Sequence, residues 1–394
     1  MTTKIINGRV ITPSEIISAN VYLDGDKISA ATADDLPADK VIDAKGLYVS
    51  PGFIDIHTHG AVNVDFTYPK GETVEENAEN VLKAVHFHMT HGTTSILPTT
   101  VAAAPEKIVY GLTAIEKAME IQKQKGKEAH IIGAHLEGPY FALSMAGGQD
   151  PKFITDPIPA DYEAIIDRFG PIISRWSYAP ERDRDASFCK YLVAHGITPS
   201  AGHTEAIYDD MLRAREAGCK CVTHLYSCTS TITRDHGFRR LGVIECAYLW
   251  DDMDIEIIAD GCHLPPTLIQ LIVKLKGTDR IALVTDSLLV AGIDAPEGVN
   301  GSVSFILEDG VCKLRDRSAF AGSIATTDRL VRVCTKDAGI PLVEAVKMAT
   351  VNPARMIGVN KGQIAPGFDA DILLFDDDIN IETVLVDGRE VYCR

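Results

Sequence analysis

The sequence predicts an α/β fold, a (β/α)8 TIM barrel with a small β-sandwich domain built from both chain ends. Short apolar runs rich in β-branched residues alternate with amphipathic stretches over roughly 240 residues in the middle of the chain. Both chain ends show short strand patterns joined by tight turns instead. Polar residues follow several of the apolar runs directly, and the carboxyl ends of barrel strands are where barrel enzymes keep their chemistry.

The two chain ends share one sequence pattern, in which short apolar runs are separated by turn-forming residue pairs. Asn7-Gly8 and Asp24-Gly25 separate short apolar runs near the start, and Asp387-Gly388 does so near the end. Such pairs are typical of β-hairpins. We therefore expect residues 1–50 and 360–394 to form one composite β domain, with residues 51–359 inserted between them as the barrel.

Eight apolar runs fit the barrel strands, and the stretches between them show a helical period. The expected strands are Phe53–Ile56, Thr94–Leu97, His130–His135, Ile172–Tyr178, Ile197–Ala201, Cys219–Thr223, Asp254–Ala259 and Arg280–Thr285. The clearest expected helices are Val74–Thr90, Glu106–Lys125, Glu205–Ala217 and Pro266–Lys276. A doubly wound open sheet gives the same alternation, so the position of the polar residues has to decide between the two folds.

Composition narrows the function classes. The chain has 394 residues, 46% of them hydrophobic, and a formal net charge of −17. This charge argues against nucleic-acid and anionic-membrane partners, which bind basic surfaces. The nine cysteines show no paired framework, and no signal peptide or membrane-spanning run is present in the sequence. We expect a cytoplasmic protein with reduced thiols.

Residues 53–60 carry the strongest local signal, Phe-Ile-Asp-Ile-His-Thr-His-Gly. In a strand, residues two apart face the same side, so His57 and His59 can point at one metal ion, with Asp55 in the same row. His86 and His88 have the same spacing inside a helical pattern, where such residues point apart. We interpret that pair, with His91, as a solvated or half-buried helix face.

Further residues with metal-binding side chains follow other predicted strands. They are Glu137 after the third strand, His203 after the fifth, His224 after the sixth and Asp286 after the eighth. Singly, each has a simpler explanation, such as a buried histidine, a helix cap or a solvated carboxylate. Together with His57 and His59 they converge only if the sheet closes, which favours a barrel with a metal site at its mouth.

The chain resembles the amidohydrolase superfamily and, within it, the N-acetylglucosamine-6-phosphate deacetylases. The motifs are Pro51-Gly52-Phe53-Ile54-Asp55-Ile56-His57-Thr58-His59-Gly60, His135-Leu136-Glu137-Gly138-Pro139, Ala201-Gly202-His203-Thr204, Thr223-His224-Leu225-Tyr226, Ala259-Asp260-Gly261-Cys262-His263, Val284-Thr285-Asp286 and Ala321-Gly322-Ser323. The glutamate is family-specific, because many amidohydrolases place a carbamylated lysine near this point. The resemblance implies a barrel of the metallo-dependent hydrolase type.

The resemblance also implies roles for these residues. Glu137, His203 and His224 would hold one divalent metal. His57 and His59, with Glu137 bridging and Asp286 nearby, would hold a second. Zinc is expected first, with iron, manganese and cobalt as alternatives. Asp286 would act as the catalytic base and then acid, and His263 would contact the substrate.

The chain departs from the family pattern in its substrate loops. The family has a histidine that polarises the substrate carbonyl where this chain has Gln149, whose amide can still donate a hydrogen bond. The family's phosphate-binding Asn-Ala pair is replaced by Ser227-Cys228. Arg234 lies about where the family has a phosphate-binding arginine supplied across a dimer interface, so a homodimer is expected. A solvated arginine-rich loop, with Arg239 and Arg240, is the alternative.

Three hypotheses follow. The first is a deacetylase of an N-acetylhexosamine 6-phosphate, with glucosamine favoured over galactosamine or mannosamine. The second is an amidohydrolase of another amide, either cyclic or unphosphorylated N-acyl. The third is a catalytically silent binding protein on the same fold.

Overall fold

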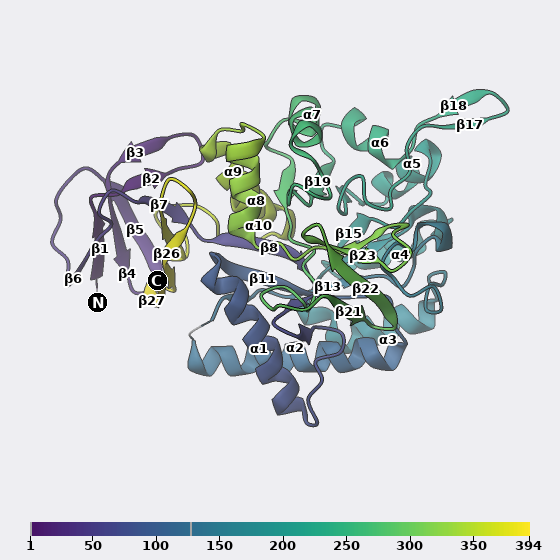
Figure 1. Cartoon of the computed structure of the whole chain (residues 1–394), viewed down its shortest axis with the longest axis horizontal. Helices are drawn as coiled ribbons and strands as arrows, with labels where there is room; N and C mark the ends of the chain where they lie inside the picture. Colours follow the sequence, from purple (N-terminus) through teal and green to yellow (C-terminus); the bar gives the residue numbers. More distant parts are fainter. Residues whose placement is uncertain (1, 127) are drawn as a thin grey trace.

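The computed structural model describes residues 2–126 and 128–394, and its centre is a nearly closed parallel barrel (Figure 1). The barrel strands are β8 (Phe53–Thr58), β11 (Thr93–Thr100), β12 (His130–Ile131) with β13 (Ala134–Glu137), β14 (Ile173–Tyr178), β15 (Thr198–Ala201), β16 (Cys221–Val222), β19 (Asp254–Ile257) and β20 (Ile281–Leu283). Each pairs in parallel with its neighbour. The backbone N–H of Asp286 donates to the carbonyl of His57 (2.9 Å), which joins the last strand to the first. The predicted barrel is confirmed.

Helices surround the barrel (Figure 1). They are α1 (Val74–Thr90), α2 (Pro105–Lys125), α3 (Pro159–Phe169), α4 (Ser187–Ala194), α5 (Tyr208–Glu216), α6 (Val243–Leu249), α7 (Pro266–Lys276), α8 (Thr327–Arg332), α9 (Leu342–Ala349) and α10 (Val351–Ile357). Helix α1 begins where predicted, because the side chain of Thr73 accepts a hydrogen bond from the N–H of Glu76 (3.1 Å) and so caps the helix. One buried hydrophobic cluster joins these helices to the strands.

Strands from both chain ends lie together beside the barrel, at the left of Figure 1. One sheet has the order β5-β4-β1-β6, with β1 (Thr2–Ile6), β4 (Asn20–Asp24), β5 (Lys27–Thr32) and β6 (Lys40–Asp43). The other has the order β27-β26-β25-β7-β2-β3, with β2 (Arg9–Ile11), β3 (Ile16–Ser18), β7 (Tyr48–Pro51), β25 (Ile372–Phe375), β26 (Ile381–Val386) and β27 (Arg389–Cys393). Ile5 and Val21 from one end share a core with Ile372 and Leu385 from the other.

The sequence pattern did not predict a four-stranded antiparallel sheet between β20 and α8. Its strands are β21 (Glu297–Asn300), β22 (Val303–Glu308), β23 (Val311–Leu314) and β24 (Phe320–Gly322). Two hairpins were also unpredicted, β9 (Gly60–Ala61) with β10 (Val64–Asp65), and β17 (Thr233–Asp235) with β18 (Phe238–Arg240). The β17–β18 hairpin projects away from the barrel (Figure 1).

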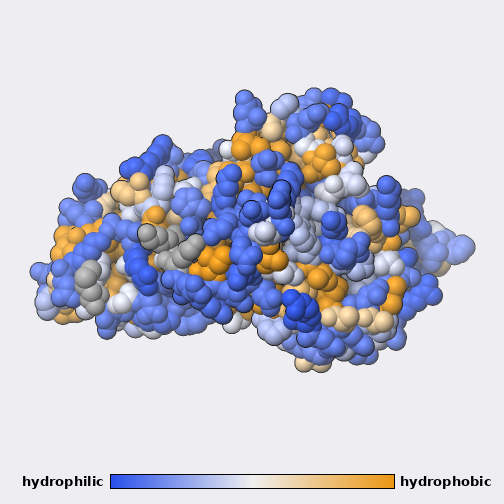
Figure 2. Space-filling model, turned by 90° about the horizontal axis from the view of Figure 1, so that it is seen from below, coloured by the Kyte–Doolittle hydropathy of each residue, from blue (hydrophilic) through white to orange (hydrophobic). Residues whose placement is uncertain are grey.

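The face shown in Figure 2 is mostly hydrophilic, and its hydrophobic residues form separate groups. Among the described residues, no helix has the length and apolar character needed to cross a membrane.

The histidines of α1 differ in burial more than the sequence pattern predicts. His86 is half exposed and lies 2.7 Å from the carboxylate of Glu128, as a helix-surface residue should. The same prediction is wrong for His88, which is fully buried. Its Nε2 donates to the carbonyl of Gly60 (3.1 Å) and lies 3.3 Å from the hydroxyl of Thr58. His88 therefore supports the chain segment that carries His57 and His59.

We expect His88 to make the fold acid-sensitive. Burial lowers the pKa of His88 from its ordinary value of 6.5 to about 4. As the pH falls below 6.5, the unfolded chain takes up a proton that the folded chain refuses until about pH 4, so folding stability falls across this window. The difference amounts to roughly 3 kcal/mol. In urea unfolding at pH 7 and pH 4.5, H88Q should lose less stability than the unmodified protein. Parallel losses in both proteins would contradict this.

Candidate metal centre

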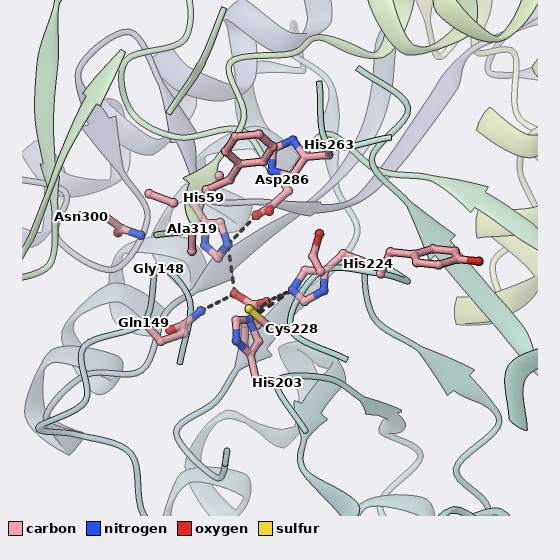
Figure 3. Close-up of a pocket in the computed structure, with 16 residues that line it drawn as sticks. His59, Gly148, Gln149, His203, His224, Cys228, His263, Asp286, Asn300 and Ala319 are labelled. Atoms are coloured by element: carbon pink, nitrogen blue, oxygen red, sulfur yellow. Dashed lines mark hydrogen bonds and ion pairs between the residues drawn. The ribbon is translucent and has the colours of Figure 1, made fainter. Parts of the chain in front are cut away.

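The side chains predicted to bind metal meet at the carboxyl ends of the barrel strands (Figure 3). His57 lies in β8, and Glu137 is the last residue of β13. His203, His224 and Asp286 follow β15, β16 and β20 within three residues. Barrel closure brings these five positions together.

Three of these residues have left-handed backbone conformations. The φ angles are 47° at His203, 28° at His224 and 47° at Asp286. Such conformations of non-glycine residues cost on the order of 1–3 kcal/mol each and persist only where the surrounding structure enforces them. The three strained turns occupy equivalent places after barrel strands, as expected where side chains are held for a function.

The ligand atoms form two adjoining groups, His57 with His59 and Asp286, and Glu137 with His203 and His224. Within each group, all ligand atoms lie within 4.8 Å of one another. Glu137 also joins the groups. Its carboxylate oxygens lie 2.8 Å from His224 Nε2, 3.1 Å from His203 Nε2, 3.2 Å from His59 Nε2 and 3.5 Å from His57 Nε2.

Hydrogen bonds on the far side of three rings fix which nitrogen faces the centre. His59 Nδ1 donates to the carbonyl of Thr99 (3.2 Å), and His203 Nδ1 donates to that of Met145 (2.8 Å). His57 Nδ1 lies 3.3 Å from the carboxylate of Glu256. In a neutral ring, the opposite Nε2 then carries a lone pair. Several lone pairs therefore converge with two carboxylates, and a divalent cation is the partner that this donor set fits.

Without a cation, protons have to balance the buried charge. Burial alone would lower the pKa of His59, but the carboxylates of Asp286 and Glu137 outweigh it and raise this pKa to about 9. Burial alone would raise the pKa of Glu137, yet the surrounding histidines, His57 and His203 foremost, hold it well below its ordinary value. The centre therefore favours ionised carboxylates beside positive charge.

Asp55 lies outside both groups, although the sequence pattern places it in a row with His57 and His59. Its carboxylate accepts hydrogen bonds from the hydroxyl of Thr285 (2.6 Å) and the backbone N–H of His57 (3.2 Å). Burial raises the pKa of Asp55 to about 6, against these hydrogen bonds. Asp55 ties β8 to the segment that carries Asp286.

A buried ion pair lies behind the centre. Arg175, from β14, pairs with Glu256, from β19, and both side chains are almost completely buried. Glu256 also contacts the Nδ1 of His57 and accepts from the backbone N–H of His224 (3.3 Å). Arg175 therefore balances the carboxylate that holds two of the histidine segments in place.

The centre opens into a cavity of about 300 Å³. Its lining residues are His59, Glu137, Gly148, Gln149, His203, His224, Tyr226, Ser227, Cys228, His263, Asp286, Asn300, Ala319, Phe320, Ala321 and Gly322. No lysine or arginine of the described chain is among them.

The structure places four of the five predicted substrate-binding residues at this cavity: Gln149, Ser227, Cys228 and His263. Arg234 does not lie there. It belongs to the exposed β17–β18 hairpin, which projects away from the barrel of its own chain (Figure 1).

The unpredicted sheet supplies the remaining wall. Asn300 ends β21 and Phe320 begins β24, and both line the cavity. Asn300 is buried, and its Oδ1 has no hydrogen-bond partner among the described residues. The motif Ala321-Gly322-Ser323 is recognisable in the sequence. Nothing in the sequence pattern indicates that the strands before it fold over the barrel mouth.

Comparison with known proteins places the chain in a family. A family model described as "Amidohydrolase family" matches residues 48–391. The chain belongs to this family, as the strand-end histidines and carboxylates of the barrel indicate.

Within the family, the chain is similar along most of its length to sugar-phosphate deacetylases. The chain is 29% identical over 357 residues to N-acetylglucosamine-6-phosphate deacetylase of Lysinibacillus sphaericus, covering 88% of this chain and 86% of the relative. The crystal structure of this deacetylase from Pasteurella multocida has a TM-score of 0.89 at 27% identity and full coverage of both chains. The structure of a variant of the Mycobacterium smegmatis deacetylase, in complex with N-acetyl-D-glucosamine-6-phosphate, has a TM-score of 0.86 at 27% identity, with 99% of both chains covered. The resemblance inferred from the sequence motifs is confirmed.

We expect R175M to destabilise the fold strongly. Removing the guanidinium leaves the Glu256 carboxylate buried without its partner, and breaking such a pair costs about 3–5 kcal/mol. R240M is the matched control, because the ion pair of Arg240 with Asp235 lies on the exposed hairpin and such pairs contribute about 0–1 kcal/mol. The midpoint of urea unfolding measures both. Equal shifts in the two variants would contradict a structural role for the buried pair.

Proposed function

We propose that this protein is a metal-dependent deacetylase that hydrolyses the acetamide of N-acetylglucosamine 6-phosphate, or of a close N-acetylhexosamine 6-phosphate. The products are acetate and an amino sugar phosphate. The observation that carries the proposal is the position of Glu137, which lies among four histidines at the barrel mouth of a chain similar to these deacetylases along its length.

The metal ligands are proposed as the two groups of the centre. Glu137, His203 and His224 hold one divalent ion, and His57 and His59, with Glu137 and Asp286, hold a second. Zinc suits imidazole and carboxylate ligands best, and iron, manganese and cobalt are alternatives. When bound, such a metal lowers the pKa of water from about 15.7 to about 7 and polarises a carbonyl oxygen.

Asp286 is proposed as the group that moves the proton. Its carboxylate lies 3.1 Å from His59 Nε2 and lines the cavity. Burial alone would raise the pKa of Asp286, but the hydrogen bond from His59 and the charges of His57 and His59 together outweigh burial and keep the carboxylate ionised. An ionised carboxylate there accepts a proton from the attacking water and then gives it to the nitrogen of the departing amine.

His263 is proposed to contact the substrate. Its Nδ1 lies 2.9 Å from the carboxylate of Asp260, which also accepts from the backbone N–H of His263 (2.7 Å). These two contacts hold the ring against rotation at the cavity wall. Because Nδ1 is committed to Asp260, Nε2 is the atom available to the substrate.

The substrate phosphate is proposed to bind Arg234 of a second copy in a homodimer. Within its own chain Arg234 is remote from the cavity, and a guanidinium binds two phosphate oxygens at once. Ser227 and Cys228 line the cavity where the resemblance predicts phosphate contacts. All nine cysteines are free, in line with a proposed cytoplasmic location.

A second candidate function rests on the same cavity. Since no lysine or arginine of the described chain lines it, a dianionic phosphate would meet no guanidinium or ammonium group of this chain in the cavity. An unphosphorylated N-acyl or cyclic amide has no such need. This alternative predicts turnover that is indifferent to a 6-phosphate.

Acetate release distinguishes the two candidates. Protein of known metal content should release acetate from N-acetylglucosamine 6-phosphate much faster than from N-acetylglucosamine. D286N should lose at least about 100-fold in kcat, because it removes the proton-transferring carboxylate. Equal turnover of both sugars would favour the second candidate. No turnover of either, with metal bound, would reject deacetylation of these sugars.

A subunit-mixing experiment tests Arg234. R234A and D286N should each be nearly inactive toward the phosphorylated sugar. In a mixed dimer, the R234A subunit keeps Asp286 and receives Arg234 from its neighbour. Co-expression should therefore restore about a quarter of the sites. If Arg234 served its own site, or no dimer formed, the mixture would stay inactive.

A further inference from the structure

The side chain of Gln149 is held at both ends of its amide. Its Oε1 accepts a hydrogen bond from the backbone N–H of Ala102 (2.7 Å). Its Nε2 donates to Oε2 of Glu137 (2.6 Å). Gln149 is only 4% exposed, and Figure 3 shows its amide pointing into the space between His59 and His203.

The orientation of this amide is determined by its partners. A backbone N–H can only donate, so the atom facing Ala102 has to be the oxygen, and the nitrogen then faces Glu137. A carboxylate accepts that donor well, because hydrogen bonds to ionised groups are the stronger ones. Gln149 therefore joins the chain just after β11 to the residue that ends β13.

The loop of Gln149 is fixed from outside as well. The N–H of Gln149 donates to the carbonyl of Ala146 (2.9 Å), and the hydroxyl of Ser302 donates to the carboxylate of Asp150. A Cβ atom added at Gly148 would lie 2.6 Å from the carbonyl oxygen of Ala321. The sheet over the barrel mouth thus holds the loop that carries Gln149.

We propose that Gln149 is a positioning residue for the metal centre, which sets the plane of the Glu137 carboxylate between the two histidine groups. The terminal torsion of a glutamate is soft, so its carboxylate needs partners at both oxygens to fix its rotation. Oε1 of Glu137 faces His203 and His224, while Oε2 faces His59 and the amide of Gln149. The inference rests on the proposed metal site and is independent of which amide is hydrolysed.

Metal binding without substrate tests this role. Q149M keeps the size and the apolar stem but removes the donor, and Q149E replaces the donor with a charge that repels Glu137. Both should lower the affinity for zinc by about 10- to 100-fold, the usual effect of losing a hydrogen-bond partner of a metal ligand. The rate of zinc loss to a chelator should rise accordingly. With Co²⁺ in place of zinc, the visible absorption bands should shift, since the ligand field changes.

N300A is the matched control, because Asn300 is a buried amide at the same cavity and makes no hydrogen bond to Glu137 among the described residues. It should keep zinc affinity and the Co²⁺ spectrum. If Q149M fails to fold, Q149E carries the test. The proposal would be overturned if the Gln149 variants bound zinc within twofold of the unmodified protein and gave an unchanged Co²⁺ spectrum. A raised KM in the same variants would then make Gln149 a substrate-binding residue. Failure of acetate release alone would bear only on the proposed reaction.

Discussion

The centre of this molecule depends on one buried carboxylate, that of Glu137. An ionised carboxylate away from water is stable only with compensating charge and hydrogen bonds. Four histidine Nε2 atoms and the Gln149 amide surround it. The rings of His57, His59 and His203 and the Gln149 amide are in turn held by a backbone carbonyl, a carboxylate or a backbone N–H. These three rings are therefore fixed from outside, and a divalent cation would balance the charge at their meeting point.

Barrel closure makes this convergence possible, and the strained turns complete it. Alternate side chains of a barrel strand point into the barrel, but a residue that follows the strand takes its direction from the turn. The left-handed backbone at His203, His224 and Asp286 redirects the chain just after each strand. The bond from the Asp286 N–H to the His57 carbonyl then places the last strand end beside the first. The backbone conformations of these turns are unfavourable by themselves, and the hydrogen-bonded parallel strands around them stabilise them.

The sequence allowed the barrel, the mixed origin of the end strands and the convergence of six histidine and carboxylate side chains to be predicted, because strand spacing and strand ends follow local rules. It did not reveal that Asp55 turns to Thr285, or that His88 is buried under the Gly60 carbonyl. Both depend on contacts between segments far apart in the chain. The sheet of β21–β24 was missed for the same reason, since nothing in its local pattern indicates which surface it covers.

The residues whose place in the site could be predicted from the sequence differ in kind from those whose place could not. The proposed metal ligands occupy repeated strand-end positions, so their spacing can be recognised in the sequence. The other cavity walls include Asn300, Phe320 and the loop of Gln149, which lie in segments without the barrel's repeat. The cavity walls carry no lysine or arginine of the described chain, while Arg234 lies on a hairpin that projects outward. A guanidinium or ammonium group that binds an anionic substrate would therefore have to come from beyond the cavity walls, as from a second molecule.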